Sequence, residues 1–500
     1  MTRKTILLPF SLIIVLSLAY VPNVVNAENA RPNILFLFSD DHALKAISAY
    51  GGPLAKIAPT PNIDRIAKGG MLFPNCLVTN SICAPSRAVV LTGKYSHING
   101  QLTNKGKFDG SQQTVQQLLR QAGYQTAIIG KWHLKSTPTG FDHYEVLKGQ
   151  GRYYNPVLLT NGKDIKHTGY TTDIITDQTL SWLKQRNRNK PFFLMCHHKA
   201  PHGTWEPAVR HLPYLDDVQI PEPPTLFDDY ATRKAAAGHK MGIADHMGPR
   251  RLLFQFSSKL TPKQFKRLDA HYRPRNEAYR KAKLSGKERT RWHYQRYMKN
   301  YLRCVKAVDE NVGRLLDYLE ESGLAKNTVV IYSSDQGFYL GEHGWFDKRW
   351  MYAESLHTPL LIRWPGVTTP GSTNDALVSN LDYAETFLDM AKSKIPADMQ
   401  GRSLVPLLRG KTPPGWRKTF YYHYYEAGGH GVPIHYGVTD GRYKLIRFPD
   451  KKLNTWEFFD RKTDPLELQN RYDDTQYKAT IHQLSQELDR LRRQYEVAKQ

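Results

Sequence analysis

Continuous runs of apolar residues recur along the chain and alternate with amphipathic segments. Five runs have the length of a strand, at residues 33–38, 126–129, 191–196, 328–333 and 359–363. Runs of this kind are typical of parallel strands that are buried on both faces. Between them, apolar residues recur every three or four positions, as in 115–122 and 297–319, which predicts helices ending near Gly123 and Gly323. The pattern predicts an α/β fold with a large, mostly parallel sheet sandwiched by helices.

The pattern changes after residue 395. Short apolar and aromatic runs at 419–425, 435–439, 443–448 and 456–459 are separated by turn sequences such as Asp440-Gly441. They predict an antiparallel meander or hairpins, followed by a charged helix over 477–497. Because 500 residues are too many for one small core, we expect a large domain over 28–395 and a smaller C-terminal α+β subdomain, with an antiparallel sheet, over 396–500.

The stretch at about 220–296 is Pro-rich at its start and then strongly basic. It predicts a helical insertion in the large domain. A solvated helical surface is favoured for it over a dedicated groove for polyanions.

The first 27 residues have the features of a signal peptide. Arg3-Lys4 precede an apolar run from Ile6 to Tyr20, and Val25-Asn26-Ala27 offers a cleavage site after Ala27. The apolar run is too short to span a membrane convincingly. We therefore expect export to the periplasm or the exterior, without stable membrane insertion.

The chain is strongly basic, with a formal net charge of +24. Removing Arg3 and Lys4 with the leader leaves 24 − 2 = +22, because residues 1–27 contain no acid. Such a charge attracts polyanions. Nucleic acid is not expected as a partner, because the protein is predicted to be exported and no nucleic-acid-binding signature is present. Four cysteines in a chain of this length do not form a disulfide framework.

Polar clusters follow four of the predicted strands, at the sheet edge where open α/β folds bind ligands. Two adjacent carboxylates, Asp40 and Asp41, repel each other unless a cation joins them, and a hard divalent cation suits their oxygens. A solvated loop with a helix cap explains this pair equally well. The other clusters are Lys131 with His133, His197-His198-Lys199 with His202, and Asp335 with Gln336. The histidine cluster suggests zinc or anion chemistry, and zinc is disfavoured by the lack of a nearby Cys or Glu at ligand spacing.

Cys83-Ala-Pro-Ser-Arg87 combines a turn with a helix start. Pro85 fixes the backbone, Ser86 favours a helix start, and a helix N-terminus suits an anionic group. The spacing alone favours a structural cysteine.

The longer segment C-A-P-S-R-A-V-V-L-T-G, however, resembles the activation signature of the cysteine-type sulfatases of the alkaline phosphatase superfamily. The resemblance extends over nearly the whole mature chain, in family order. It implies an alkaline phosphatase-like fold and oxidation of Cys83 to formylglycine, by a formylglycine-generating or an anaerobic sulfatase-maturating enzyme.

The resemblance also implies the roles of individual residues. Calcium is bound by Asp40, Asp41, Asp335 and Gln336 together with residue 83, although the family usually has Asn or His where this chain has Gln336. Around the sulfate lie Arg87, Lys131, His202 and Lys348, and His133 assists the aldehyde hydrate. Asp347 and Arg349 flank Lys348 and contact sugar hydroxyls or a carboxylate, or form only a surface ion pair. His435 is a further expected substrate contact.

The blocks H-K-A-P-H-G and S-D-Q-G-F-Y-L-G-E-H-G look most similar to glucosamine-6-sulfatase-like members. The hypothesis is an exported, exo-acting sulfatase on a glycosaminoglycan or algal polysaccharide fragment, with N-acetylglucosamine 6-O-sulfate as a candidate. A phosphatase or phosphonate hydrolase on the same fold is one alternative, disfavoured because those enzymes usually have Thr or Ser at the nucleophile. A non-catalytic binder of sulfated glycan ranks last, because it has no evident need for the metal cluster.

Overall fold

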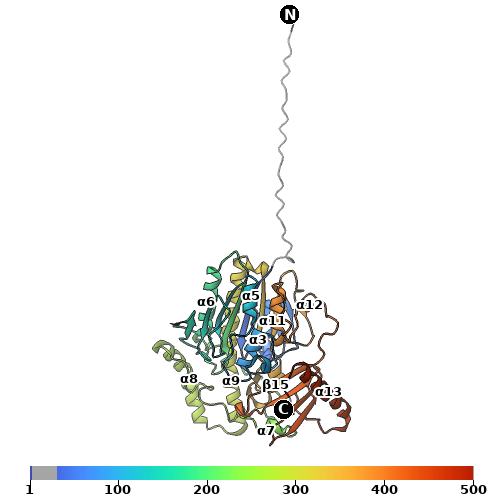
Figure 1. Ribbon diagram of the computed structural model, residues 1–500. Coiled ribbons are helices and arrows are strands. Elements are labelled where there is room, and N and C mark those ends of the chain that lie inside the picture. Colours follow the sequence, from blue (N-terminus) through green and yellow to red (C-terminus); the bar gives the residue numbers. More distant parts are fainter. Residues whose placement is uncertain (3–30, 499–500) are drawn as a thin grey trace. The chain divides into compact units, whose positions relative to one another are not determined.

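A ten-stranded sheet forms the centre of the protein (Figure 1). The computed structural model describes residues 1–2 and 31–498, and from Arg31 onward the chain forms one compact unit. The predicted leader peptide and its cleavage site lie outside the described residues. The strands follow the order β13 (Ser372–Thr373), β2 (Met71–Leu72), β12 (Leu360–Arg363), β9 (Thr328–Ser334), β1 (Asn33–Asp40), β8 (Phe192–Pro201), β4 (Gln125–Lys131), β5 (His143–Leu147), β6 (Val157–Thr160) and β7 (Lys163–Lys166).

The five central strands, from β9 to β5, run parallel. The run at 359–363, which becomes β12, instead pairs antiparallel with β9, and β6 and β7 add an antiparallel hairpin that the apolar pattern did not predict. The sheet is therefore mixed but mostly parallel, as predicted.

Alternate residues of the central strands enter two separate cores, one on each face of the sheet. Leu35 and Leu37 of β1 face one core, whereas Phe36 and Phe38 face the other, and all four are fully buried. This two-sided burial explains the uninterrupted apolar runs. The first core includes residues of α2 (Pro61–Lys68), α6 (Thr171–Gln185) and α9 (Gly286–Glu321). The second includes α3 (Cys83–Thr92), α5 (Val115–Gln121), α11 (Tyr383–Met390) and α12 (Val405–Leu408) (Figure 1).

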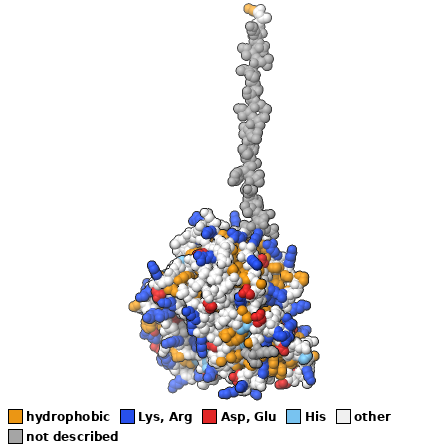
Figure 2. Space-filling model, in the orientation of Figure 1, with side chains coloured by type: hydrophobic (Ala, Val, Ile, Leu, Met, Phe, Trp, Pro, Cys, Tyr) orange, Lys and Arg blue, Asp and Glu red, His pale blue; other side chains and the backbone are white. Residues whose placement is uncertain are grey.

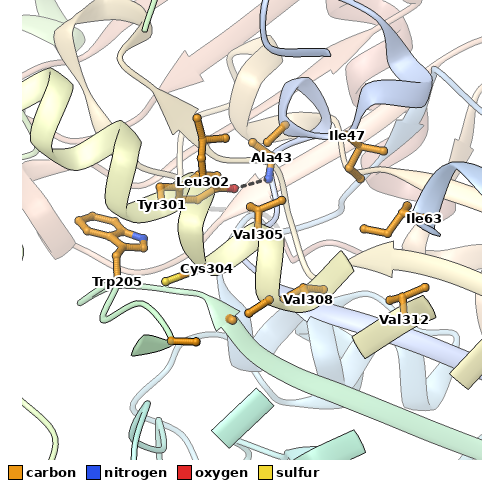
Figure 3. Close-up of a cluster of buried hydrophobic side chains, with 14 of the residues drawn as sticks. Ala43, Ile47, Ile63, Trp205, Tyr301, Leu302, Cys304, Val305, Val308 and Val312 are labelled. Carbon is orange, nitrogen blue, oxygen red and sulfur yellow. Dashed lines mark hydrogen bonds between the residues drawn. The ribbon is translucent and has the colours of Figure 1, made fainter. Parts of the chain in front are cut away.

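The long helix α9 holds the loop that follows β1. Its Val305, Val308 and Val312 are fully buried and lie at helical spacing beside Ile63 (Figure 3). Burying each such side chain contributes roughly 1.5–3 kcal/mol. The Tyr301 hydroxyl accepts a hydrogen bond from the Ala43 amide at 2.8 Å and donates one to the Asp41 carbonyl at 2.8 Å. The core helix thus fixes the backbone at the carboxyl end of β1.

A second, four-stranded antiparallel sheet lies toward the C-terminus, as predicted. It consists of β15 (Phe420–Tyr424), β16 (His435–Thr439), β17 (Tyr443–Phe448) and β18 (Thr455–Asp460). The helix α13 (Lys478–Gln494) packs its Leu484, Leu488 and Leu491 against residues of this sheet. Two small ladders join β10 (Tyr339–Leu340) to β11 (Phe346–Asp347), and β3 (Cys76–Leu77) to β14 (Val378–Ser379).

Residues 220–260 contain one short helix, α7 (Lys234–Ala237), among turns, whereas α8 (Pro262–Ala282) and the first part of α9 complete the basic stretch. Lys and Arg side chains are spread widely over the face shown in Figure 2. None of the helices in residues 31–498 is long and apolar enough to cross a membrane. The remaining short helices are α1 (Leu54–Ile57), α4 (Ser96–Asn99) and α10 (Ala353–Leu356).

Candidate active site

The predicted polar clusters meet at one edge of the large sheet because their strands are neighbours in the order β9-β1-β8-β4. Asp40 ends β1 and Lys131 ends β4, and their side chains form an ion pair. Asp335 follows β9, and its Oδ1 accepts a hydrogen bond from the Asp41 amide at 3.1 Å. Three carboxylates and three cations gather here, and we call them the sheet-edge cluster: Asp40, Asp41, Asp335, Arg87, Lys131 and Lys348.

Each carboxylate of this cluster contacts a cation. Lys348 Nζ lies 2.7 Å and 2.8 Å from the two carboxylate oxygens of Asp41. Arg87 Nη2 lies 3.0 Å from Asp335 Oδ2 and 3.7 Å from Asp40 Oδ1. All six residues are at most 3% exposed, so these charges depend on one another rather than on water.

Cys83 is the first residue of α3 and is fully buried beside this cluster. Gln336 Nε2 lies 3.8 Å from its sulfur and donates a hydrogen bond to Asp41 Oδ1. All four cysteines are free, so the Cys83 thiol is not held in a disulfide. Burial, together with the Asp40 charge, raises the pKa of this thiol, and it is therefore a poor nucleophile as an unmodified cysteine.

The oxygen atoms of the cluster form a candidate metal centre. One carboxylate oxygen from each of Asp40, Asp41 and Asp335 lies within 4.8 Å of the others. Asp40 Oδ1 and Gln336 Oε1 are buried without a hydrogen-bond partner, which is costly unless another group satisfies them. An all-oxygen set suits a hard cation such as Ca²⁺ better than zinc. The residues present therefore fit a calcium ion.

The histidines at the end of β8 and just after it make different contacts. His197 Nδ1 lies 3.3 Å from Arg87 Nη1 and 3.1 Å from the Lys131 carbonyl, and His198 contacts Cys196. His202 Nε2, in contrast, lies 3.8 Å from Asp41 Oδ2. Of these three, only His202 lies near a carboxylate of the sheet-edge cluster, whereas His197 contacts its Arg87.

Burial and neighbouring charges set the protonation of the cluster. Burial tends to raise the pKa of Asp40, but the surrounding cations, Lys131 foremost, hold it well below its usual range. Burial and the Asp40 charge raise the pKa of Asp335 to about 8. Burial, followed by the charge of Lys131, lowers the pKa of His133 to about 2. Strand β4 ends at Lys131, and His133 has a left-handed backbone with a φ of 57°, so the two side chains do not alternate along one strand.

A cavity of about 520 Å³ opens over this edge. Asp41, His202 and Lys348 contribute to its wall, as do Asp347 and Arg349. Asp347 (φ 85°) and Arg349 (φ 97°) have left-handed backbones, which non-glycine residues adopt at a cost of order 1–3 kcal/mol and which are common at functional sites. Their side chains lie 3.6 Å apart at Arg349 Nη2 and Asp347 Oδ2.

His435 does not join these residues. It is fully buried in β16, its Nε2 accepts a hydrogen bond from the Met351 amide at 3.1 Å, and its Nδ1 donates to the Pro433 carbonyl at 2.9 Å. It does not line the cavity, whereas His430, in the preceding loop, does and pairs with Asp347.

Other cavity residues were missed because no short motif marks them. Gln150 accepts a hydrogen bond from Lys131 Nζ, and Asn104 Oδ1 accepts one from the Ala84 amide at 2.9 Å. Arg250 and Arg251 come from the basic stretch that was interpreted as a solvated surface. All four lie in loops, and only that basic composition could have indicated the two arginines.

The sheet-edge cluster of buried carboxylates and cations lies below a cavity and beside Cys83, at the start of α3. This arrangement is typical of hydrolases that act on anionic esters. Comparison with known proteins gives the family. A model described as sulfatase matches residues 32–393, and one described as N-sulphoglucosamine sulphohydrolase, C-terminal, matches 341–494. The chain belongs to the sulfatase family and is a sulfuric ester hydrolase.

Several known proteins are similar over most of the chain. The N-acetylglucosamine-6-O-sulfatase of Bacteroides thetaiotaomicron is 47% identical over 98% of this chain and 91% of its own length. The human N-acetylglucosamine-6-sulfatase is 30% identical over 81% of this chain and 69% of its own. A solved structure of a protein in complex with its substrate D-glucosamine-2-N,6-O-disulfate is 46% identical, with a TM-score of 0.90 over 93% of this chain and 98% of that one.

Proposed function

We propose that this sulfatase hydrolyses the 6-O-sulfate ester of an N-acetylated or N-sulfated glucosamine at the end of a sulfated glycan. One observation carries the proposal: a single cavity joins His202 and Lys348, which suit a sulfate group, to Asp347 and Arg349, which suit sugar hydroxyls. The similarity to N-acetylglucosamine-6-sulfatases supports this choice of sugar.

Asp40, Asp41, Asp335 and Gln336 would hold one Ca²⁺ ion, which when bound polarises the sulfate and lowers the pKa of the attacking hydroxyl. Residue 83 would supply that hydroxyl as the hydrate of formylglycine, made from Cys83 by a maturating enzyme. The high pKa of the unmodified thiol fits a need for this conversion.

The cations around this position would bind and orient the sulfate. Arg87, Lys131, His202 and Lys348 would stabilise the charge that develops on its oxygens. The leaving alkoxide requires a proton, and His202 and Lys348 reach the cavity where it departs. His133, whose buried Nδ1 has no hydrogen-bond partner, would accept a proton from the hydrate when sulfate is expelled.

Asp347 and Arg349, which flank Lys348 in the cavity wall, would recognise the sugar. The carboxylate of Asp347 accepts and the guanidinium of Arg349 donates, so together they match the hydroxyls of one pyranose ring. His430 orients Asp347 through their ion pair.

Turnover of a panel of small esters tests the proposal. N-acetylglucosamine 6-sulfate should be hydrolysed at least about 100-fold faster, by kcat/KM, than its 3-sulfate, galactose sulfates or glucosamine 6-phosphate. Turnover restricted to aryl sulfates would overturn the sugar assignment, and preference for the phosphate would overturn the ester class.

We further propose that the leader ends at Ala27 and that the mature enzyme acts in the periplasm or outside the cell. We also propose a catalytic domain over 28–395, with the basic insertion at about 220–296, and a C-terminal subdomain over 396–500. The N-terminal sequence of the protein from its native host tests the cleavage, and limited proteolysis near residue 395 tests the boundary.

A further inference from the structure

A second charged depression lies between α8 and α9, outside the catalytic cavity. It has a volume of about 160 Å³, room for about five water volumes of ~30 Å³ each, which suits one tetrahedral anionic group. We call it the α8–α9 pocket. It is lined by Asp216, Tyr272, Arg275, Trp292, Gln295, Arg296, Lys299 and Arg303.

Four of these residues are cations, and one is an acid. Asp216 pairs with Arg275 at 2.9 Å and with Arg303 at 2.6 Å. Arg296 and Lys299 have no carboxylate within ion-pair distance among the described residues. Lys299 Nζ instead donates to the Asp216 carbonyl at 2.7 Å. Two cations are therefore left without a carboxylate partner in a confined space, while the other two share the single carboxylate of Asp216.

Arg296 is held rigidly at the floor. It is 7% exposed, its Cζ lies 5.2 Å from the ring of Tyr272 and 4.7 Å from that of Trp292, and its Nη1 donates to Asn276 Oδ1 at 3.0 Å. Burial, together with the charge of Arg303, lowers the pKa of Arg296 to about 10. A guanidinium fixed in this way loses little entropy when it binds an anion.

One segment, residues 248–255, separates this pocket from the catalytic cavity. Gly248–Arg251 and Gln255 line the catalytic cavity, while the Leu252 carbonyl accepts a hydrogen bond from Arg296 at 3.2 Å. Arg250 is exposed on this segment and forms no ion pair among the described residues. A glycan whose end occupies the catalytic cavity would contact Arg250 and Arg251 where it passes over this segment.

We propose that the α8–α9 pocket is a second binding site, which holds a sulfate group of the same sulfated glycan at a distance from the scissile ester. The proposal rests on the proposed function for the identity of the glycan. The pocket would increase affinity for chains over monosaccharides, because a tethered second contact acts at high effective concentration.

Binding of a heparin-derived octasaccharide tests the proposal. In 0.15 M salt, the double variant Arg275→Gln/Lys299→Gln should bind it about tenfold more weakly than the unaltered enzyme, since two direct charge contacts are lost. The matched control Lys266→Gln/Lys281→Gln removes two exposed charges of α8 that do not line the pocket, and should change the affinity less than about twofold. Lys299→Gln alone, which breaks no ion pair, should show part of the loss even if the double variant folds poorly.

Equal weakening in the control and the double variant would overturn the proposal, as would no weakening in either. A second arm measures binding of inorganic sulfate at matched ionic strength. Loss of inorganic sulfate binding without loss of octasaccharide binding would overturn the glycan assignment. Hydrolysis of N-acetylglucosamine 6-sulfate should be unchanged in both variants, and its absence in the unaltered enzyme would instead contradict the proposed function.

Discussion

The sheet-edge cluster and the α8–α9 pocket are both rich in charge, but they are built differently. In the first, three carboxylates face three cations, and every one of these residues is almost fully buried. In the second, four cations face one carboxylate, and Arg275 is 43% exposed. A buried cluster with balanced charges can position reacting groups without reorganising, whereas a partly exposed pocket with excess positive charge attracts an anion. This difference in charge balance and exposure suits the sheet-edge cluster to catalysis and the α8–α9 pocket to binding.

Removing Cys83, beside the sheet-edge cluster, should have the largest effect. Cys83→Ala deletes the proposed precursor of the nucleophile, so kcat should fall on the order of 10³-fold or more. Cys76→Ala is a matched control, because Cys76 is equally buried and free. It should lower the free energy of unfolding by about 1 kcal/mol and leave kcat within about twofold. Steady-state kinetics give kcat for both variants. Retained activity in Cys83→Ala would refute the proposed role of Cys83.

Chelation of calcium should have the next largest effect. Without the ion, Asp40 Oδ1 and Gln336 Oε1 lack a partner, so activity should drop at least about tenfold and return on adding Ca²⁺. Calcium at about 100 times its Kd should also raise the free energy of unfolding by about 2.7 kcal/mol. Activity and thermal unfolding across a calcium titration measure both effects. An enzyme indifferent to chelator and to added calcium would contradict the metal assignment.

Substitutions on the sugar side should act through KM. Asp347→Asn and Arg349→Lys each weaken a charged hydrogen bond worth about 1.5–3 kcal/mol, so kcat/KM for N-acetylglucosamine 6-sulfate should fall about 10- to 100-fold. Hydrolysis of an aryl sulfate should change little. His435→Gln should leave KM unchanged, because His435 does not line the cavity. Equal losses on both substrates would show that these residues serve the fold rather than the sugar.

Salt should give the smallest effect and the most direct contrast between the two regions. Raising the salt from about 0.05 to 0.2 M should increase KM for a sulfated octasaccharide severalfold, because exposed charges are screened. Turnover of the monosaccharide should change less than about twofold, because the sheet-edge cluster is buried. Parallel salt profiles for the two substrates would remove the distinction between the regions.

Much of this architecture could be predicted because it depends on local pattern. The apolar run at 33–38 becomes β1, and the run at 126–129 becomes β4. The carboxyl ends of parallel strands lie at one edge of a sheet, so Asp40, Lys131 and Asp335 were expected at that edge, and the observed strand order brings them together. The spacing of apolar residues over 297–319 likewise indicated α9.

The cavity wall could not be predicted in the same way, since its loops are positioned by tertiary packing. His430 and His435 lie five positions apart, yet one lines the cavity and the other is enclosed within β16. Arg296 was interpreted as part of a solvated surface, but contacts with Tyr272 and Trp292 bury it. The composition shows that this stretch is basic, but only the folded structure shows which of its cations are paired with a carboxylate.

The most direct test of the account is the mass of the peptide that contains Cys83, measured on protein from its native host. The account predicts the mass of the aldehyde at residue 83, as required for a sulfatase whose buried thiol is itself a poor nucleophile. A peptide that carries only the unmodified thiol would contradict it.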